Sequence, residues 1–182
     1  ITGKYLSILR ELIPGLTRAA IVYNPASAPG AGTVFLPAFI EAANQYKIEP
    51  ITIQVHSPAE IETSFARLAD QPNLGIIVMP DNFTSLNRKL LTTLAARYRI
   101  PTIYPYRYFV EAGGLLSYGV DAIDLFRQAA DYVSRILRGA NPANLPVQAP
   151  TEFELVINLK AAKDLGLTVP RVLLAGANDV VY

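Results

Sequence analysis

The chain has 182 residues, a length typical of one domain or of one domain with an appendage. Hydrophobic residues make up 51% of it, which excludes intrinsic disorder because that much apolar surface can form a core. Lys and Arg number 16 and Asp and Glu 15, giving a net charge of +1 without the basic patch expected of a nucleic-acid-binding protein. No apolar run approaches the ~20 residues of a membrane span. The absence of cysteine excludes disulfides, thiolate nucleophiles and cysteine-based metal sites.

We expect no signal peptide within these residues, because residue 1 leads directly into an amphipathic run over residues 5–13. A natural N-terminus seldom begins one residue before a helix, so we expect a processed chain or a fragment of a longer protein. Charged residues make up 17% of the sequence, below the ~25% of an average soluble chain. This low fraction predicts a face of the protein that is covered.

Short apolar runs alternate with amphipathic segments through the first 104 residues. Runs rich in β-branched and aromatic residues predict strands at 19–23, 51–55, 74–79 and 102–104. Apolar residues at helical spacing predict helices at 33–47, 58–69 and 86–98, the second opened by the capping signal Ser57-Pro58-Ala59-Glu60. Unbroken apolar strands with helical connections indicate the α/β class. The expected architecture is a doubly wound parallel sheet with helices on both faces, a three-layer αβα fold.

The regular alternation of predicted strands and helices ends after residue 106. A strand is predicted at 115–119, and Asp121 is the predicted cap of a long helix that ends near Gly139. A connector rich in proline over residues 142–150 leads to a further strand at 153–157 and a short helix at 159–165.

Polar side chains follow the predicted parallel strands, at the sheet edge where ligands bind in open α/β folds. They are Asn24 and Ser27, then His56 and Ser57, then Asp81, Asn82 and Thr84, then Tyr106 and Arg107. Amides, hydroxyls, one carboxylate and an aromatic ring favour small-molecule binding over catalysis, and Tyr106 and Tyr108 are candidates to stack on a ligand. Taken singly, Asn24 is equally explained by a turn, and Asp81 or Thr84 by helix capping, and both interpretations stay open.

The sequence does not contain the complete form of several common cofactor-binding and catalytic motifs. The run Gly30-Ala31-Gly32 lacks the third glycine of a dinucleotide-binding fingerprint, because Phe35 stands at that position. Glycines flank Ser117 without the spacing of a nucleophile elbow, and no Walker A lysine is present. His56 is the only histidine, and beside a helix cap it is best interpreted as a surface residue or a ligand contact. We therefore expect no catalytic residues, no metal site and no cofactor.

Longer segments carry a resemblance to a known family. They are residues 4–15 leading into 20–25, residues 76–82, 100–104 and 109–121, and residues 150–158. In order and spacing over essentially the whole chain, these segments resemble the ABC-transporter substrate-binding protein family. Within the type I periplasmic binding proteins, they resemble the branch that includes receptors for aromatic amino acids such as tryptophan. Members of the family have a further first lobe and an export signal before the position of residue 1.

The resemblance implies a two-lobed clamshell without catalytic activity in the periplasm or another extracytoplasmic space. It would capture a small molecule, with a leaning to aromatic amino acids, and deliver it to a membrane permease. Residues 1–115 and 146–182 would form the second lobe. Residues 116–145, a crossover strand and helix, would pack on the missing first lobe. We expect the unpartnered helix at 122–138 to make this fragment dimerise or swap that helix between chains.

The same resemblance assigns the ligand-binding positions. Those that would face the cleft are Asn24, Ser27, Asp81, Asn82, Thr84 and Tyr106, with Tyr118 and Asp121 near the hinge. Asp81 would receive a ligand ammonium group, and the other polar side chains would form hydrogen bonds. Two other functions stay open at this point: a ligand-sensing domain of a regulator or receptor with the same fold, and an α/β enzyme, against which the failed motifs argue.

Overall fold

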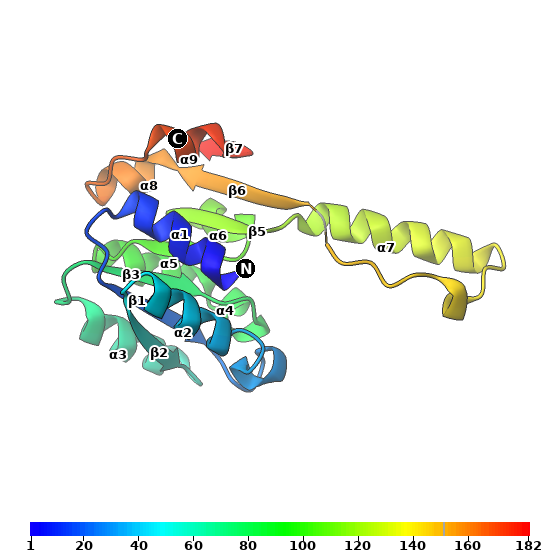
Figure 1. Cartoon of the computed structure of the whole chain (residues 1–182), viewed down its shortest axis with the longest axis horizontal. Helices are drawn as coiled ribbons and strands as arrows, with labels where there is room; N and C mark the ends of the chain where they lie inside the picture. The colour runs from blue at the N-terminus through cyan, green and yellow to red at the C-terminus, as the bar shows by residue number, and fades with distance from the viewer. Residues whose placement is uncertain (151) are drawn as a thin grey trace.

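The computed structural model of the protein describes residues 1–150 and 152–182. A seven-stranded sheet in the order β2-β1-β3-β4-β5-β6-β7 runs through the body (Figure 1). The strands are β1 (Arg18–Tyr23), β2 (Glu49–Gln54), β3 (Leu74–Val78), β4 (Thr102–Tyr104), β5 (Leu116–Val120), β6 (Phe153–Asn158) and β7 (Asp179–Val181). Neighbouring strands are parallel except β5 and β6. The expected α/β fold with a mostly parallel sheet is confirmed.

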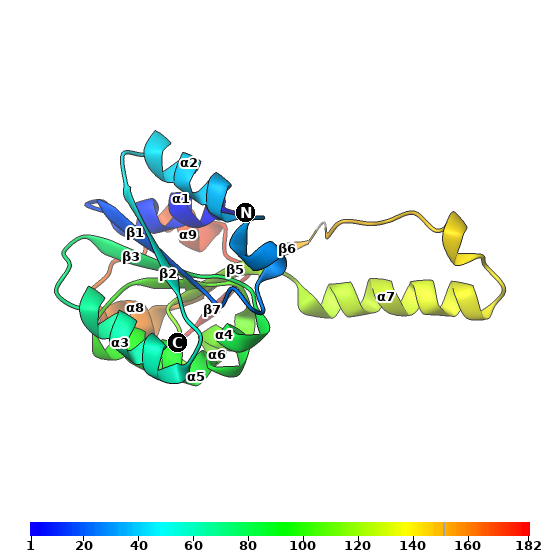
Figure 2. The same cartoon turned by 90° about the horizontal axis from the view of Figure 1, so that it is seen from below.

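Helices cover both faces of the sheet. α1 (Thr2–Leu12) and α2 (Leu36–Gln45) lie on one face, and α3 (Pro58–Leu68) and α5 (Arg88–Arg97) lie on the other (Figure 2). Because side chains alternate along a strand, the strands feed two separate cores. Ile21 and Ile77 join the core beneath α1 and α2, whereas Val22 and Val78 join the core beneath α3 and α5. The three layers follow from these two cores.

The capping residues predicted for α3 form hydrogen bonds at the start of that helix. Ser57 Oγ accepts a hydrogen bond from the Glu60 amide at 3.3 Å, and Glu60 Oε2 accepts one from the His56 amide at 3.0 Å. These two bonds satisfy backbone donors that the first turn of α3 leaves free. The predicted start of this helix is confirmed.

Other boundaries differ from the prediction. The helix predicted at 33–47 begins at Leu36, after a 3₁₀ turn at Pro29–Gly32. The helix predicted at 86–98 is found as α5, and a short helix that was not predicted, α4 (Asn82–Leu86), precedes it. Three further elements were not predicted, α6 (Arg107–Glu111), α9 (Arg171–Ala175) and β7, whereas α8 (Leu159–Asp164) lies where it was expected. The missed elements have three to five residues. They are too short to show a periodic pattern.

The position of β5 corrects one expectation. Residues 116–145 were expected to leave this body together, but β5 is hydrogen-bonded into the sheet on both sides. Leu116 pairs with Ile103 of β4 and with Ile157 of β6. Leu116 and Ser117 are both only 1% exposed. Since burial and pairing hold this strand in the sheet, the segment that leaves the body starts after Val120.

The segment that leaves the body is α7 (Ala122–Leu137), followed by residues 138–150, which contain one 3₁₀ turn and no strand. Both views show α7 projecting away from the sheet (Figures 1 and 2). Asp121 Oδ1 caps it, accepting hydrogen bonds from the amides of Ile123 at 2.8 Å and Asp124 at 3.2 Å, as predicted. Within the described chain no residue of α7 is buried. Across residues 1–150 and 152–182, every helix is too short or too polar to span a membrane.

Candidate functional site

The carboxylate of Asp81 joins two loops at the carboxyl edge of the sheet. Asp81 follows β3 and caps α4, and its Oδ1 accepts a hydrogen bond from the Thr84 amide at 2.7 Å. The same oxygen accepts from Ser27 Oγ at 3.1 Å, and Oδ2 accepts from the Asn24 amide at 3.0 Å. The loop after β1 is therefore fixed to the loop after β3 across 57 residues of sequence.

Asn24 and Thr84 serve the loops themselves. Asn24 Oδ1 accepts a hydrogen bond from the Ala26 amide at 2.7 Å, the turn that its residue type predicted. Thr84 is fully buried, and its hydroxyl lies 2.9 Å from the Met79 carbonyl and 3.0 Å from the Asp81 carbonyl. In this structure the Thr84 side chain has no open path to a ligand. Thr84 therefore holds the loop together from within α4, and the helix cap that the sequence offered to either residue is supplied by Asp81.

A hollow of about 670 Å³ opens beside these loops. Four of the expected residues line it: Ser27, Asp81, Asn82 and Tyr106. Ser85 and Tyr108 line it as well, together with the first half of α7, which contributes Leu125 and Phe126. Its size falls in the range of small-molecule sites. We call this hollow the edge site.

Two tyrosines form the aromatic wall of the edge site. The rings of Tyr106 and Tyr108 stack with centroids 5.2 Å apart. Ser85 Oγ and the Tyr108 hydroxyl are 2.9 Å apart, and the Arg88 guanidinium lies 5.8 Å from the Tyr108 ring centroid. Burial raises the pKa of both tyrosine hydroxyls, so each stays protonated as a hydrogen-bond donor.

Tyr118 and Asp121, expected near the hinge, do not line the edge site. The Tyr118 ring stacks on the Phe153 ring with centroids 5.8 Å apart. It also packs edge to face with the Tyr5 ring, with centroids 6.2 Å apart, on the side of the sheet that α1 covers. Asp121 acts as the cap of α7. Both lie where the chain leaves the body and returns to it, since Tyr118 is in β5 and faces Leu155 of β6.

Arg107 is a functional candidate whose contacts the sequence did not reveal. Its guanidinium forms ion pairs with Glu154 of β6, at 3.5 Å, and with Asp179 of β7, and a third with Glu111 at 3.4 Å. Arg107 holds the pKa of the Asp179 carboxyl below its usual value, whereas burial raises the pKa of Glu154. This cluster ties α6 to the strands that follow the projecting segment.

In residues 1–150 and 152–182, no group of three or more His, Asp or Glu side chains is placed to hold a cation. The single histidine lies on the surface, where its Nδ1 is 3.0 Å from Glu60 Oε2. What the edge site offers is hydroxyls, an amide, a carboxylate and aromatic rings. These groups bind a small molecule by hydrogen bonding and stacking.

Similarity to a known family identifies the family of this chain. The family of ABC transporter substrate binding proteins matches residues 2–181. The chain belongs to this family. No curated protein matches it.

Solved structures show the same fold. A conserved domain protein from Vibrio cholerae O1 biovar El Tor is similar at 26% identity with a TM-score of 0.87, over 98% of this chain and 60% of its own. An ABC domain in complex with L-Trp from Streptococcus pneumonia has 24% identity and a TM-score of 0.87, over 99% of this chain and 60% of its own. A ligand-free, open substrate binding protein with adhesive properties from Clostridium difficile has 20% identity and a TM-score of 0.70, over 97% and 58%. The chain thus spans about 60% of the length of the structures it resembles.

Proposed function

We propose that this chain forms one wall of a cleft that captures a small solute, in the solute-binding component of an ABC importer. The observation that carries the proposal is the edge site, where Ser27, Asn82 and Tyr106 from three separate loops line one hollow. These loops follow parallel strands, and open α/β folds bind ligands at that edge. Membership of the substrate-binding family supports the same role.

The residues of the edge site favour an amino acid with an aromatic side chain as the ligand. Among residues 1–150 and 152–182, the Asn24 amide is the one donor to Asp81 Oδ2, so this oxygen retains a lone pair for a ligand ammonium group. Asn82 is exposed and supplies an amide group for hydrogen bonding. The stacked pair Tyr106 and Tyr108 offers a flat apolar surface for a ring.

Transport requires that the captured solute be passed to a permease, and we propose a periplasmic or other extracytoplasmic location for this role. The chain alone covers about 60% of the solved structures it resembles, so we expect a second wall from outside residues 1–182. A ligand enclosed on one side only loses part of the contact surface that produces affinity. We therefore expect this chain to bind its ligand more weakly than micromolar.

Titration with L-tryptophan tests the proposal. The chain contains no tryptophan, so the emission of the ligand's indole reports binding directly. We expect saturable binding that Tyr106→Ala weakens about three- to tenfold, the effect of losing a stacking partner. Tyr182→Ala is the matched control, because Tyr182 is 89% exposed and does not line the edge site. Binding that Tyr106→Ala leaves unchanged, or no binding of any amino acid, would refute the proposal.

We further infer that the outer stripe of α7 contacts another polypeptide surface, and a second copy of this chain when it is isolated. The stripe consists of Ile123, Phe126, Ala130, Val133 and Leu137, at helical spacing. Phe126 is 78% exposed and Leu137 is 83% exposed. Contiguous apolar surface of this kind is seldom left open to water.

Light scattering on the purified chain tests this inference. We expect a concentration-dependent dimer, formed by packing or by exchange of α7, that Leu137→Glu converts to a monomer, since Leu137 belongs to the stripe and does not line the edge site. Asn144→Glu makes the same change in charge at an exposed position outside the stripe and should leave the dimer intact. A wild-type chain that remains monomeric at high concentration would contradict the inference.

A further inference from the structure

The edge site has two walls that belong to different parts of the chain. The aromatic wall, Tyr106 and Tyr108, lies at the start of α6. Leu125 and Phe126, in the first half of α7, form the other wall, which we call the helical wall. The chain enters α7 after Val120 at the end of β5 and returns to the body through β6 (Figure 1). The spacing of the two walls therefore depends on how α6 is held against β5 and β6.

Arg107 connects the aromatic wall to the strand by which the chain returns. It follows Tyr106 directly but does not line the edge site. Its guanidinium instead pairs with Glu154 of β6, at 3.5 Å, and with Asp179 of β7. α6 begins at Arg107 and has only five residues. A helix this short is not stable by itself, so its position depends on contacts such as these.

A backbone contact at Gly119 holds the same loop against β5. Gly119 pairs with Glu154 in the sheet, so the ion pair of Arg107 lies at the same level of the two strands. The Pro105 carbonyl oxygen is so close to Gly119 that an added Cβ would lie 1.8 Å from it. The loop formed by residues 105–107 is therefore held against both strands, by packing on β5 and by an ion pair on β6.

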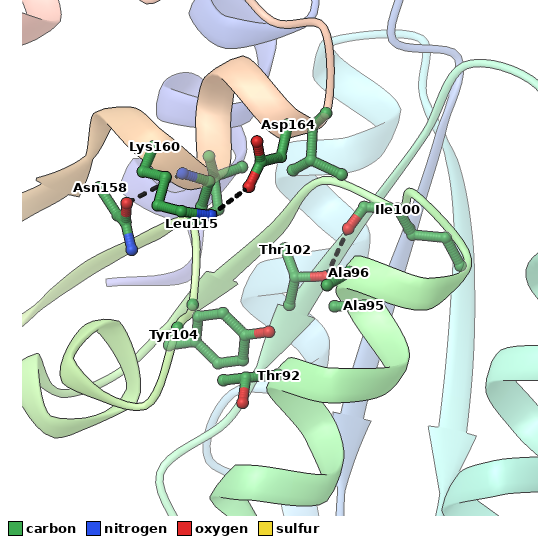
Figure 3. Close-up of a pocket in the computed structure, with 14 residues that line it drawn as sticks. Thr92, Ala95, Ala96, Ile100, Thr102, Tyr104, Leu115, Asn158, Lys160 and Asp164 are labelled. Carbon is green, nitrogen blue, oxygen red and sulfur yellow. Dashed lines mark hydrogen bonds and ion pairs between the residues drawn. The ribbon is translucent and has the colours of Figure 1, made fainter. Parts of the chain in front are cut away.

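A column of stacked rings holds the aromatic wall from its inner side. From the edge site inward, its members are Tyr106, Tyr108, Phe109 and Tyr104, with neighbouring centroids 5.2, 5.2 and 5.0 Å apart. Phe109 and Tyr104 are fully buried, and Figure 3 shows the Tyr104 ring on the wall of a pocket between α5 and α8. Because the inner end of the column lies in the core, the contacts of Arg107 act on its outer end.

Arg107 supplies the positive charge within a group of acidic side chains. The Glu154 side chain is only 19% exposed, and it lies near the carboxylates of Asp179 and Asp121. Glu111 pairs with Arg107 from the next turn of α6. Without the guanidinium, these like charges would repel one another across α6, β6 and β7. Loss of Arg107 would therefore move α6 away from the two strands.

We propose that Arg107 is the positioning residue of the edge site, which sets the spacing between the aromatic wall and the helical wall without contacting the ligand. This inference rests on the proposed function, because it gives Arg107 a part in solute binding. An aromatic ring between the two walls is bound best when their spacing is already correct before it arrives. The ion pairs of Arg107 therefore act on affinity through Tyr106 and Tyr108.

Two readouts on Arg107→Ala and Arg107→Lys test the proposal, both recorded at a temperature at which all variants are folded. One is the affinity for L-tryptophan, and the other is the NMR signals of the Tyr106 and Tyr108 rings without ligand. We expect Arg107→Ala to weaken binding about three- to tenfold and to shift the signals of both rings, which stack at 5.2 Å. Arg107→Lys should restore part of both, because an ammonium group can still pair with Glu154 or Asp179.

Arg18→Ala is the matched control. Arg18 pairs with Glu49 at 2.9 Å and joins β1 to β2 at their amino ends, away from the edge site, so its loss should change neither readout. Ring signals or an affinity that Arg107→Ala leaves unchanged would overturn the proposal, and a lysine variant that restores neither would overturn the role of the charge. If the wild type binds no amino acid, the proposed function fails, whereas ring signals shifted by Arg107→Ala and restored by Arg107→Lys would still support the positioning of the aromatic wall.

Discussion

Replacing Asp81 with alanine tests whether its carboxylate holds the two loops of the edge site together. The carboxylate accepts three hydrogen bonds, from the Thr84 amide, the Asn24 amide and Ser27 Oγ. Loss of the cap on α4 costs about 1 kcal/mol. The buried Asn24 amide is then left without an acceptor, which costs about 1–3 kcal/mol. Ser27 is only half-buried and can bond to water instead. Asp81→Ala is therefore expected to lower the free energy of unfolding by about 2–4 kcal/mol.

Urea denaturation at neutral pH measures this loss, and two variants serve as references. Asp81→Asn keeps an oxygen for Thr84 and Ser27 but places an NH₂ group against the Asn24 amide, so we expect an intermediate loss of about 1–2 kcal/mol. Asp70→Ala removes an exposed carboxylate at the end of α3 and should change stability by less than about 0.5 kcal/mol.

Hydrogen exchange locates the effect. In Asp81→Ala, the Asn24 and Thr84 amides should exchange faster, because the carboxylate is their acceptor in the wild type. A loss of less than about 1 kcal/mol for Asp81→Ala, or unchanged exchange at Asn24, would refute the reasoning that this carboxylate holds the two loops together.

Three further variants change residues in β7, in β5 and just after α7. Asp179→Asn should destabilise the protein at pH 7, since Arg107 lowers the pKa of Asp179 below its ordinary value of 3.8. The stability from this pair is present above that value and lost as the pH falls through the lowered pKa, so the wild type and the variant should converge in unfolding experiments at strongly acid pH. Gly119→Ala should prevent stable folding, measured by thermal unfolding, because a Cβ would lie 1.8 Å from the Pro105 carbonyl oxygen. Gly139→Ala, where no atom lies within 4 Å of the added Cβ, should cost only the strain of its positive φ of 98°.

The position of the binding edge was predictable from the sequence, whereas its internal connections were not. The sequence placed Ser27, Asn82 and Tyr106 after parallel strands, and these residues do line one hollow. It left open whether Asp81 caps a helix or binds a ligand, and the structure shows three bonds to its own chain. The long-range partners of Asp81 and Arg107 lie 47 to 72 residues distant along the chain. No local pattern specifies such pairs.

The amino-acid sequence by itself determined the α/β class, the first four strands, the capped start of α3 and the exposed apolar stripe of α7, because hydrophobic periodicity and capping are properties of single segments. Only the tertiary structure decided that β5 pairs inside this sheet and that β6 runs antiparallel to it. The tertiary structure also brought Tyr104 beneath a cavity between α5 and α8. The physical reason is that strand pairing and cavities depend on which distant segments come together, and this is settled only when the whole chain buries its apolar surface.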